Sequence, residues 1–211
     1  ALQRVQVDAR DAMRVQLGGA VGTLAVMGER GPAVRAALAQ ALGLADAGAS
    51  WHTQRESWVA LGCAVGVLVG ACGKMARDWS LMMQAEVGEL SEPHESGRGA
   101  SSAMAHKRNP VAAMTALAAA QRVPHRVAAL LACMTQEHER ALGGWQAELA
   151  EWAGLWISAA GAVHALADAA PGLVVHRGRL LANLEVHRGV FEIDEALAVL
   201  LPRKISPGNR L

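Results

Sequence analysis

The stretch SWVALGCAVGVLVGACG, residues 57–73, decides the fold, because it contains no charged side chain between Glu56 and Lys74. Glycines at 62, 66 and 70 recur every four residues, which places them on one face of a helix and lets a neighbouring backbone approach closely. The length reaches the lower limit for a membrane span. The centre of a helical bundle explains the pattern as well, and we expect a bundle and no membrane partner.

The whole chain is expected to be all-α. It contains no Tyr and one Phe, while Ala, Leu, Met and Arg dominate its long segments, and residues of this kind favour helix over strand. Asn109 is predicted to cap a helix that starts at Pro110 and has a kink at Pro124. The predicted helices cover about 2–16, 32–42, 56–90, 110–135 and 145–171.

The last of these helices carries a stripe of large side chains. Trp145, Leu149, Trp152 and Trp156 step by four, three and four residues, which predicts the buried face of a helix. Several long helices that are apolar on much of their circumference are hard to bury within one short chain. A homo-oligomeric bundle is therefore expected.

Charge and cysteine content narrow the class of protein. The 20 basic and 19 acidic residues give a net charge of +1, so the chain lacks the basic stripe that nucleic-acid binding requires, and no nucleic-acid partner is expected. The three cysteines are an odd number without a CxxC pair. They indicate reduced thiols and a cytoplasmic protein. Because the chain opens at Ala1 in helix-like sequence, we expect it to be part of a longer protein.

The stretch GRGASSAMAHKRNP, residues 97–110, is the segment in which chemistry is expected. Backbone amides around Gly99 and Ser101, the positive end of the next helix and the charge of Lys107 together favour a carboxylate. The same dipoles would stabilise a serine alkoxide. Composition alone leaves a second interpretation open, an ordinary exposed connection between two helices.

The order of the residues in this stretch matches a known motif. The string S-S-x-M-x-x-K-x-N-P resembles GSSxMPxKxNP, the signature loop of the fumarase/aspartase superfamily, and it is formed here by Ser101, Ser102, Met104, Lys107, Asn109 and Pro110. Three other strings resemble one branch of that superfamily, the bacterial 3-carboxy-cis,cis-muconate cycloisomerases. They are QLGGAVGTLAVMGERG at 16–31, WHTQRE at 51–56 and TQEHERALGGWQAEL at 135–149.

The resemblance implies an architecture. Members of the superfamily are homotetramers built around a central bundle of very long helices, and each active site is assembled from three subunits. Residues 1–188 would be part of this central domain, and residues 189–211 would begin a C-terminal helical domain. No metal and no organic cofactor are implied.

The resemblance also implies roles for individual residues. Ser101 would transfer the proton, Lys107 and Asn109 would hold substrate carboxylate, and Ser102 and Met104 would contribute to the oxyanion-binding turn and anchor the loop. Arg55 and Arg140, which lie in the HTQR and HER strings, are the other candidates for binding a di- or tricarboxylate substrate.

The implied reaction interconverts 3-carboxy-cis,cis-muconate and a carboxymuconolactone during protocatechuate degradation. A carboxylate oxygen adds to a double bond of the same molecule, and a proton is delivered to the adjacent carbon. The reverse is proton abstraction next to a carboxylate, with a carboxylate as leaving group. Charge on the intermediate requires fixed cations and amides around the substrate.

Three histidines lie in the matching strings. His52, His106 and His138 are expected to be hydrogen-bonded structural residues rather than catalysts, because imidazole serves many such roles. None has the spacing of a zinc ligand, and no HExxH string is present.

The sequence departs from the superfamily at three positions. Met114 stands five residues beyond the motif asparagine, where the lyases that use a catalytic histidine have a glutamate; this disfavours an adenylosuccinate-type lyase, which remains an alternative. Ala105 replaces the motif proline and gives the loop more freedom. Ala100 replaces a glycine and would be strained if that position requires a positive φ. Both alanines favour a third possibility, a catalytically inactive structural homologue.

Overall fold

The computed structural model describes residues 1–93, 97, 99–104 and 107–187. Ala105, His106 and the predicted C-terminal domain at 189–211 lie outside this part of the chain. The elements are α1 (Leu2–Ala12), β1 (Arg14–Val15), η1 (Ala25–Arg30), α2 (Gly31–Leu42), β2 (Ala45–Asp46), α3 (Glu56–Met82), β3 (Leu90–Ser91), α4 (Val111–Ala132), α5 (Gly144–Ala169), η2 (Ala170–Gly172), β4 (Val174–Val175) and α6 (Arg177–His187).

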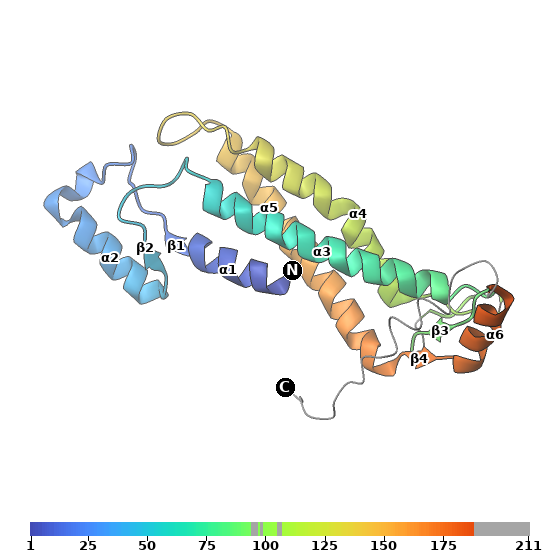
Figure 1. Cartoon of the computed structure of the whole chain (residues 1–211). Helices are drawn as coiled ribbons and strands as arrows, with labels where there is room; N and C mark the ends of the chain where they lie inside the picture. Colours follow the sequence, from blue (N-terminus) through green and yellow to red (C-terminus); the bar gives the residue numbers. More distant parts are fainter. Residues whose placement is uncertain (94–96, 98, 105–106, 188–211) are drawn as a thin grey trace, which may run out of the picture.

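Three long helices, α3, α4 and α5, form the body of the molecule, and α1 lies along α3 (Figure 1). Their contact is fully apolar at its centre, where the side chains of Leu61, Val65, Val123, Leu155 and Leu166 are almost completely excluded from solvent. Burying each such side chain contributes about 1.5–3 kcal/mol. The predicted helical bundle is thus confirmed.

Two predicted helices are shorter than expected, because their last residues pair as strands. The helix predicted over 2–16 ends at Ala12, and β1 pairs in parallel with β2. The helix predicted over 56–90 ends at Met82, and β3 pairs antiparallel with β4. Both partners are distant in sequence, so no local pattern signals these ends.

Glycines let α3 approach its neighbours closely, but not all at the predicted positions. A Cβ added at Gly62 would lie 2.8 Å from Leu130 Cδ1, and one at Gly66 would lie 2.9 Å from Val127 Cγ2. The third contact is made by Gly73, whose Cβ would lie 2.5 Å from that of Ala120. Gly70, which was expected in the seam, has open space around it.

The predicted stripe on α5 is only partly buried. Trp152 is 6 % exposed, whereas Trp156 is 40 % and Leu149 58 % exposed. The buried residues of α5 instead form a face that includes a carboxylate and several small side chains: Glu148, Trp152, Leu155, Ala159, Ala162, Ala165, Leu166 and Ala169. The prediction placed the buried face too far toward the tryptophans because it followed the spacing of the large apolar side chains alone, whereas Glu148 shares the buried face through its pairing with Arg55.

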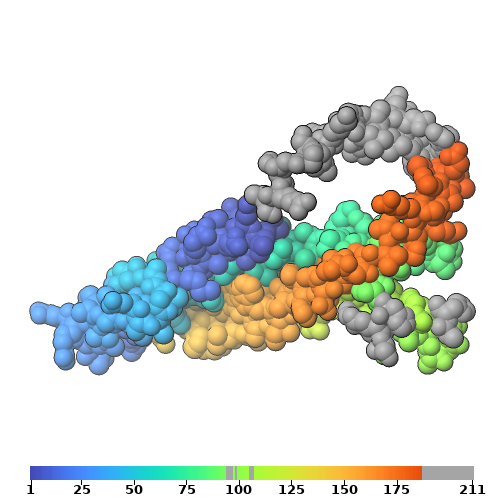
Figure 2. Space-filling view, turned by 90° about the horizontal axis from the view of Figure 1, so that it is seen from below, coloured from blue at the N-terminus to red at the C-terminus, as the bar shows by residue number. Residues whose placement is uncertain are grey.

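The molecule is an elongated rod with small substructures at its two ends. Figure 2 shows α2 at one end and α6 at the other. Within the described residues, α3 alone has the length and apolar character of a membrane span, and 44 % of its most apolar window is buried inside the bundle.

Candidate functional site

The loop that carries the superfamily motif is closed at its base by hydrogen bonds. The backbone amide of Asn109 donates to the carbonyl oxygen of Gly99 (2.8 Å), and the side-chain Nδ2 of Asn109 donates to the same oxygen (3.3 Å). Ala100 and Arg108 form an antiparallel bridge next to this pair. The side chain of Asn109 therefore fastens the loop, and the prediction that it caps α4 is wrong.

Gly99, rather than Ala100, is the position that needs a glycine. Its φ is +73°, and a Cβ added there would lie 2.7 Å from the carbonyl oxygen of Asn109. Ala100 does not have a positive φ. The backbone strain that was considered for Ala100 is therefore absent.

Ser101 is the first residue of a tight turn. Its Oγ accepts hydrogen bonds from the backbone amides of Ala103 (3.3 Å) and Met104 (3.1 Å). N–H donors directed at an oxygen favour negative charge on it. The turn is therefore suited to stabilising an alkoxide after Ser101 gives up its proton.

The other motif side chains face solvent beside two cavities. Ser102, Met104 and Lys107 are exposed. Residues 107–110, together with Met104, line a cleft of about 550 Å³ against the end of α3 at Ser80 and Met83. A smaller cavity of about 210 Å³ lies between Gly99 and β3. Five predicted residues, Ser101, Ser102, Met104, Lys107 and Asn109, are thus brought together around one surface loop.

The N-terminus of α4 is already occupied by a carboxylate. Glu92 accepts hydrogen bonds from the backbone amides of Ala112 and Ala113, each at 3.0 Å, one with each carboxylate oxygen. These amides were predicted to form part of an anion site for substrate, and that part of the prediction is wrong. Because Glu92 lies 20 residues before Ala112, no sequence signal at the start of the helix reveals it.

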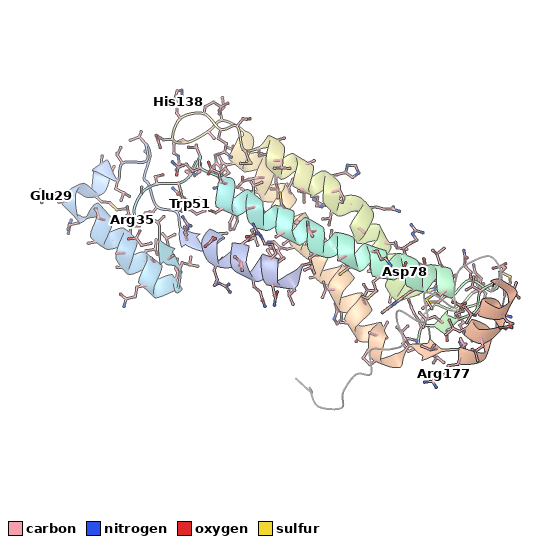
Figure 3. All side chains as sticks on the ribbon, in the orientation of Figure 1. Glu29, Arg35, Trp51, Asp78, His138 and Arg177 are labelled. Atoms are coloured by element: carbon pink, nitrogen blue, oxygen red, sulfur yellow. The ribbon has the colours of Figure 1, made fainter. Side chains whose placement is uncertain are left out.

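The two arginines predicted to bind substrate lie at the opposite end of the bundle. Arg55 is the N-cap residue of α3, and Arg140 lies between α4 and α5. Figure 3 shows Trp51 and His138, their near neighbours in sequence, at this end, and Arg177 at the other. The 27 residues of α3 span about 40 Å at the helical rise of 1.5 Å per residue. One small substrate therefore does not reach both Ser101 and Arg140 of a single chain.

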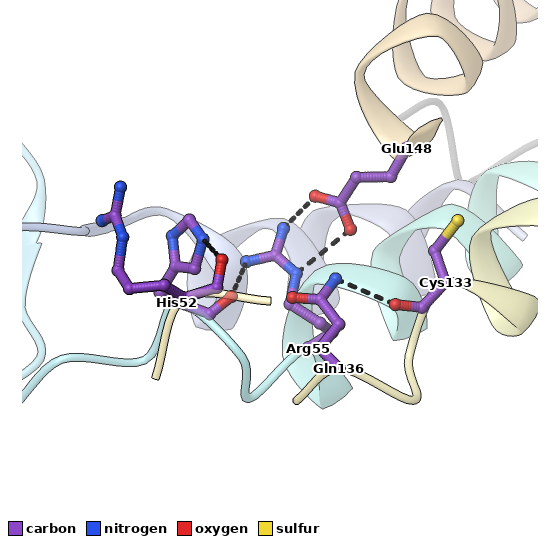
Figure 4. Close-up of polar contacts among 6 residues, drawn as sticks. His52, Arg55, Cys133, Gln136 and Glu148 are labelled. Atoms are coloured by element: carbon purple, nitrogen blue, oxygen red, sulfur yellow. Dashed lines mark hydrogen bonds and ion pairs between the residues drawn. The ribbon is translucent and has the colours of Figure 1, made fainter. Parts of the chain in front are cut away.

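Arg55 is committed to a buried ion pair (Figure 4). Its Nε donates to Glu148 Oε2 at 3.1 Å, and its Nη2 donates to Glu148 Oε1. Arg55 is 7 % and Glu148 3 % exposed. The guanidinium also lies over the rings of Trp51 and Trp58, 5.2 and 6.0 Å from their centroids. The contact with substrate that the resemblance implies for Arg55 stays a prediction, and its charge is already neutralised by Glu148.

The segment that carries Arg140 has an unusual backbone. His138 and Ala141 have φ values of +49° and +56°, which cost roughly 1–2 kcal/mol for each non-glycine residue. Two contacts from the segment before α3 hold it: Thr53 Oγ1 donates to the carbonyl oxygen of His138 (2.7 Å), and His52 Nε2 lies 3.2 Å from that of Arg140. Residues 137–142 also line an open cleft with Val21.

The pKa of His52 is lowered from its usual value. Because a carbonyl oxygen only accepts hydrogen bonds, Nε2 of His52 carries the proton in its contact with Arg140. Partial burial is the largest cause of a lowered His52 pKa, followed by the charge of Arg140. These contacts agree with the predicted structural role of this histidine. Among the described residues, no group of three or more His, Cys, Asp or Glu side chains is arranged to hold a metal.

Comparison with known proteins shows which family the chain resembles. Residues 1–125 match the model of the lyase family. The chain is 44 % identical to the 3-carboxy-cis,cis-muconate cycloisomerase of Bradyrhizobium diazoefficiens, over 95 % of this chain and 44 % of that protein. It is 46 % identical to the enzyme of the same name from Pseudomonas aeruginosa, over 90 % of this chain and 41 % of that protein. The chain thus spans less than half the length of these relatives.

A solved structure shows the same arrangement of helices. The 3-carboxy-cis,cis-muconate lactonizing enzyme from Pseudomonas putida aligns with a TM-score of 0.82 and 38 % identity, covering 97 % of this chain and 44 % of that one. The family match covers more than half of the chain and includes the motif loop with Ser101 and Lys107. On this combination of motif, fold and sequence similarity, the chain belongs to the lyase family.

Proposed function

We propose that the complete protein containing this chain is a cycloisomerase that interconverts 3-carboxy-cis,cis-muconate and a carboxymuconolactone. The observation that carries the proposal is the turn at Ser101, where two backbone amides donate to the hydroxyl oxygen within the motif loop. Two relatives that are 44 and 46 % identical over at least 90 % of the chain carry this activity in their names.

The chemistry follows from the groups around the loop. In the lactone-forming direction, a carboxylate oxygen adds to a double bond of the same molecule, and the adjacent carbon receives a proton. In the reverse direction Ser101, as the alkoxide, takes that proton while the carboxylate departs. Lys107 holds a substrate carboxylate, because its exposed ammonium lies beside the cleft at the same loop.

The separation of the two groups of residues supports a shared active site. Ser101 and Arg140 lie at opposite ends of the rod, so a second copy must supply one of them if both contact the same substrate. Apolar side chains remain exposed on α3 and α5, among them Val67 at 66 % and Ile157 at 73 %. We therefore propose a homotetramer in which neighbouring copies bury these faces and complete each site. A cytoplasmic location fits the three free cysteines.

The test uses the complete gene product and 3-carboxy-cis,cis-muconate, with loss of conjugated-diene absorbance as the readout. Turnover that falls at least about 100-fold in Ser101→Ala supports the proposal. Ser158→Ala is the matched control, because Ser158 Oγ only donates to a carbonyl oxygen within α5. Fumarate release from adenylosuccinate would point to the lyase alternative, and a folded tetramer without either activity to the structural one.

A further inference from the structure

The end of the bundle near Arg140 is held together by a chain of contacts that begins at a buried carboxylate. Glu148 lies in the second turn of α5 and is paired through two oxygens with Arg55. Arg55 in turn donates from Nη1 to the carbonyl oxygen of His52 (3.4 Å). The ion pair therefore fixes the segment before α3 against α5.

The segment before α3 contacts the loop between α4 and α5. Thr53 and His52 contact the carbonyl oxygens of His138 and Arg140, as described above. Arg140 is also tied to the first loop of the chain through a hydrogen bond from Nη1 to the carbonyl oxygen of Gly19 (3.4 Å). Three segments that are distant in sequence thus meet at residues 137–142.

The loop needs such support because its backbone is strained. Residues such as His138 and Ala141 keep a positive φ only where the surrounding structure over-determines it, and strain of this kind is often found at binding sites. Without the contacts from Thr53 and His52, the carbonyl groups would turn and the loop would relax. The direction of the Arg140 side chain would change with it.

We propose that Arg55 and Glu148 are positioning residues that act together, through residues 52 and 53, to hold the strained 137–142 loop in the conformation that presents Arg140 to substrate. Arg55 then binds no substrate itself. The inference rests on the proposed cycloisomerase function, in which Arg140 binds a substrate carboxylate.

The presence of an ion pair, rather than two apolar side chains, between the segment before α3 and α5 supports a positioning role. A buried pair adds little to stability when it is compared with apolar residues of similar size, but the planar guanidinium fixes geometry through its fork. Here the fork uses Nε and Nη2 on Glu148 and leaves Nη1 for the carbonyl oxygen of His52. An apolar pair would fill the same space without orienting residues 52 and 53.

The test distinguishes a role of the Arg55–Glu148 pair in positioning the loop from a contribution of this pair to folding stability. In the complete gene product, the double variant Arg55→Met with Glu148→Leu removes both charges together and should remain folded. Its KM for carboxymuconate is expected to rise about tenfold, which corresponds to about 1.4 kcal/mol, while kcat changes little. The matched control is Arg126→Met with Glu151→Leu, because this second pair joins α4 and α5 (2.9 Å) without contacting residues 51–55. Its KM should stay at the wild-type value.

A second variant and a second measurement test the positioning role independently of the double variant. Thr53→Val removes only the hydrogen bond to His138 and should also raise KM. This variant tests the proposal even if the double variant fails to fold. Hydrogen exchange reports on the loop directly, through the amides of Ala141 and Leu142, which both donate to Glu137 at 3.0 Å. These amides should exchange faster in the double variant and in Thr53→Val.

The outcomes distinguish the two proposals. Wild-type KM together with unchanged exchange, in every folded variant of the Arg55–Glu148 pair and of Thr53, overturns the positioning role. If the wild-type protein does not convert carboxymuconate, the proposed function fails on its own. The exchange of Ala141 and Leu142 then decides the structural part: faster exchange supports it, and unchanged exchange overturns it.

Discussion

The carbonyl oxygen of Gly99 accepts hydrogen bonds from both the backbone amide and the side chain of Asn109, and these two residues close the base of the motif loop. The distance of 2.7 Å between a Cβ at Gly99 and Asn109 O leaves no room for alanine. Gly99→Ala is expected to lower turnover and to destabilise the protein by about 1–3 kcal/mol, measured as the urea midpoint. Gly97→Ala is the control, because Gly97 has a similar φ of +79° and an added Cβ there meets no atom of the described residues within 4 Å. Equal effects of both substitutions would show that the close approach does not matter.

The carboxylate of Glu92 is expected to stabilise α4 as a cap supplied from a distant segment. Glu92→Ala leaves the amides of Ala112 and Ala113 without their acceptor, and should lower the free energy of unfolding by about 0.5–2 kcal/mol. Glu92→Gln keeps one acceptor oxygen and should lose less. The control is Glu29→Ala, since Glu29 is exposed on η1. A loss no larger than that of the control would contradict the capping role.

The lowered pKa of His52 makes stability depend on pH. Because burial and the charge of Arg140 lower its pKa from the usual 6.5, the unfolded chain binds more protons than the folded one just below pH 6.5. The contribution is therefore fully present above pH 6.5 and is lost as the pH falls through the lowered pKa. Urea midpoints measured at pH 7.5 and 5.5 should fall more for the wild type than for His52→Gln. An identical fall in both proteins would exclude His52 as the source.

Two glycines of α3 should respond to alanine in opposite directions. Gly73→Ala places a methyl group 2.5 Å from the Cβ of Ala120, which overpacks the α3–α4 contact and should cost about 1–3 kcal/mol. Gly70→Ala meets no atom within 4 Å and should stabilise the helix by about 0.5–1 kcal/mol. Thermal unfolding of the two variants checks the signs. Destabilisation by Gly70→Ala would show that another chain packs closely there.

The helices and the motif loop could be predicted because each is specified by residues that are neighbours in the sequence. The uncharged run at 57–73 allows burial on several sides, and this single property identifies α3. The order of the residues from Ser101 to Pro110 likewise needs no neighbour to be recognised. The ends of α1 and α3 could not be predicted in the same way, since the strand that follows each helix pairs with a segment far along the chain.

Glu148 shows most clearly what local patterns miss. Its place on the buried face of α5 contradicts the rule that charged residues are exposed, and it becomes understandable only when Arg55, 93 residues earlier, is seen beside it. The same holds for Glu92, whose role as a cap requires α4 to begin next to β3.

The sequence by itself determined the family, the helical class and the group of residues around Ser101, because motif order and helical periodicity are properties of neighbouring residues. The tertiary structure alone decided that Arg140 lies at the far end of the rod and that Arg55 is paired with Glu148. Long helices separate residues of the matching sequence strings by about 40 Å, and only the packing of α3, α4 and α5 fixes which side chains meet.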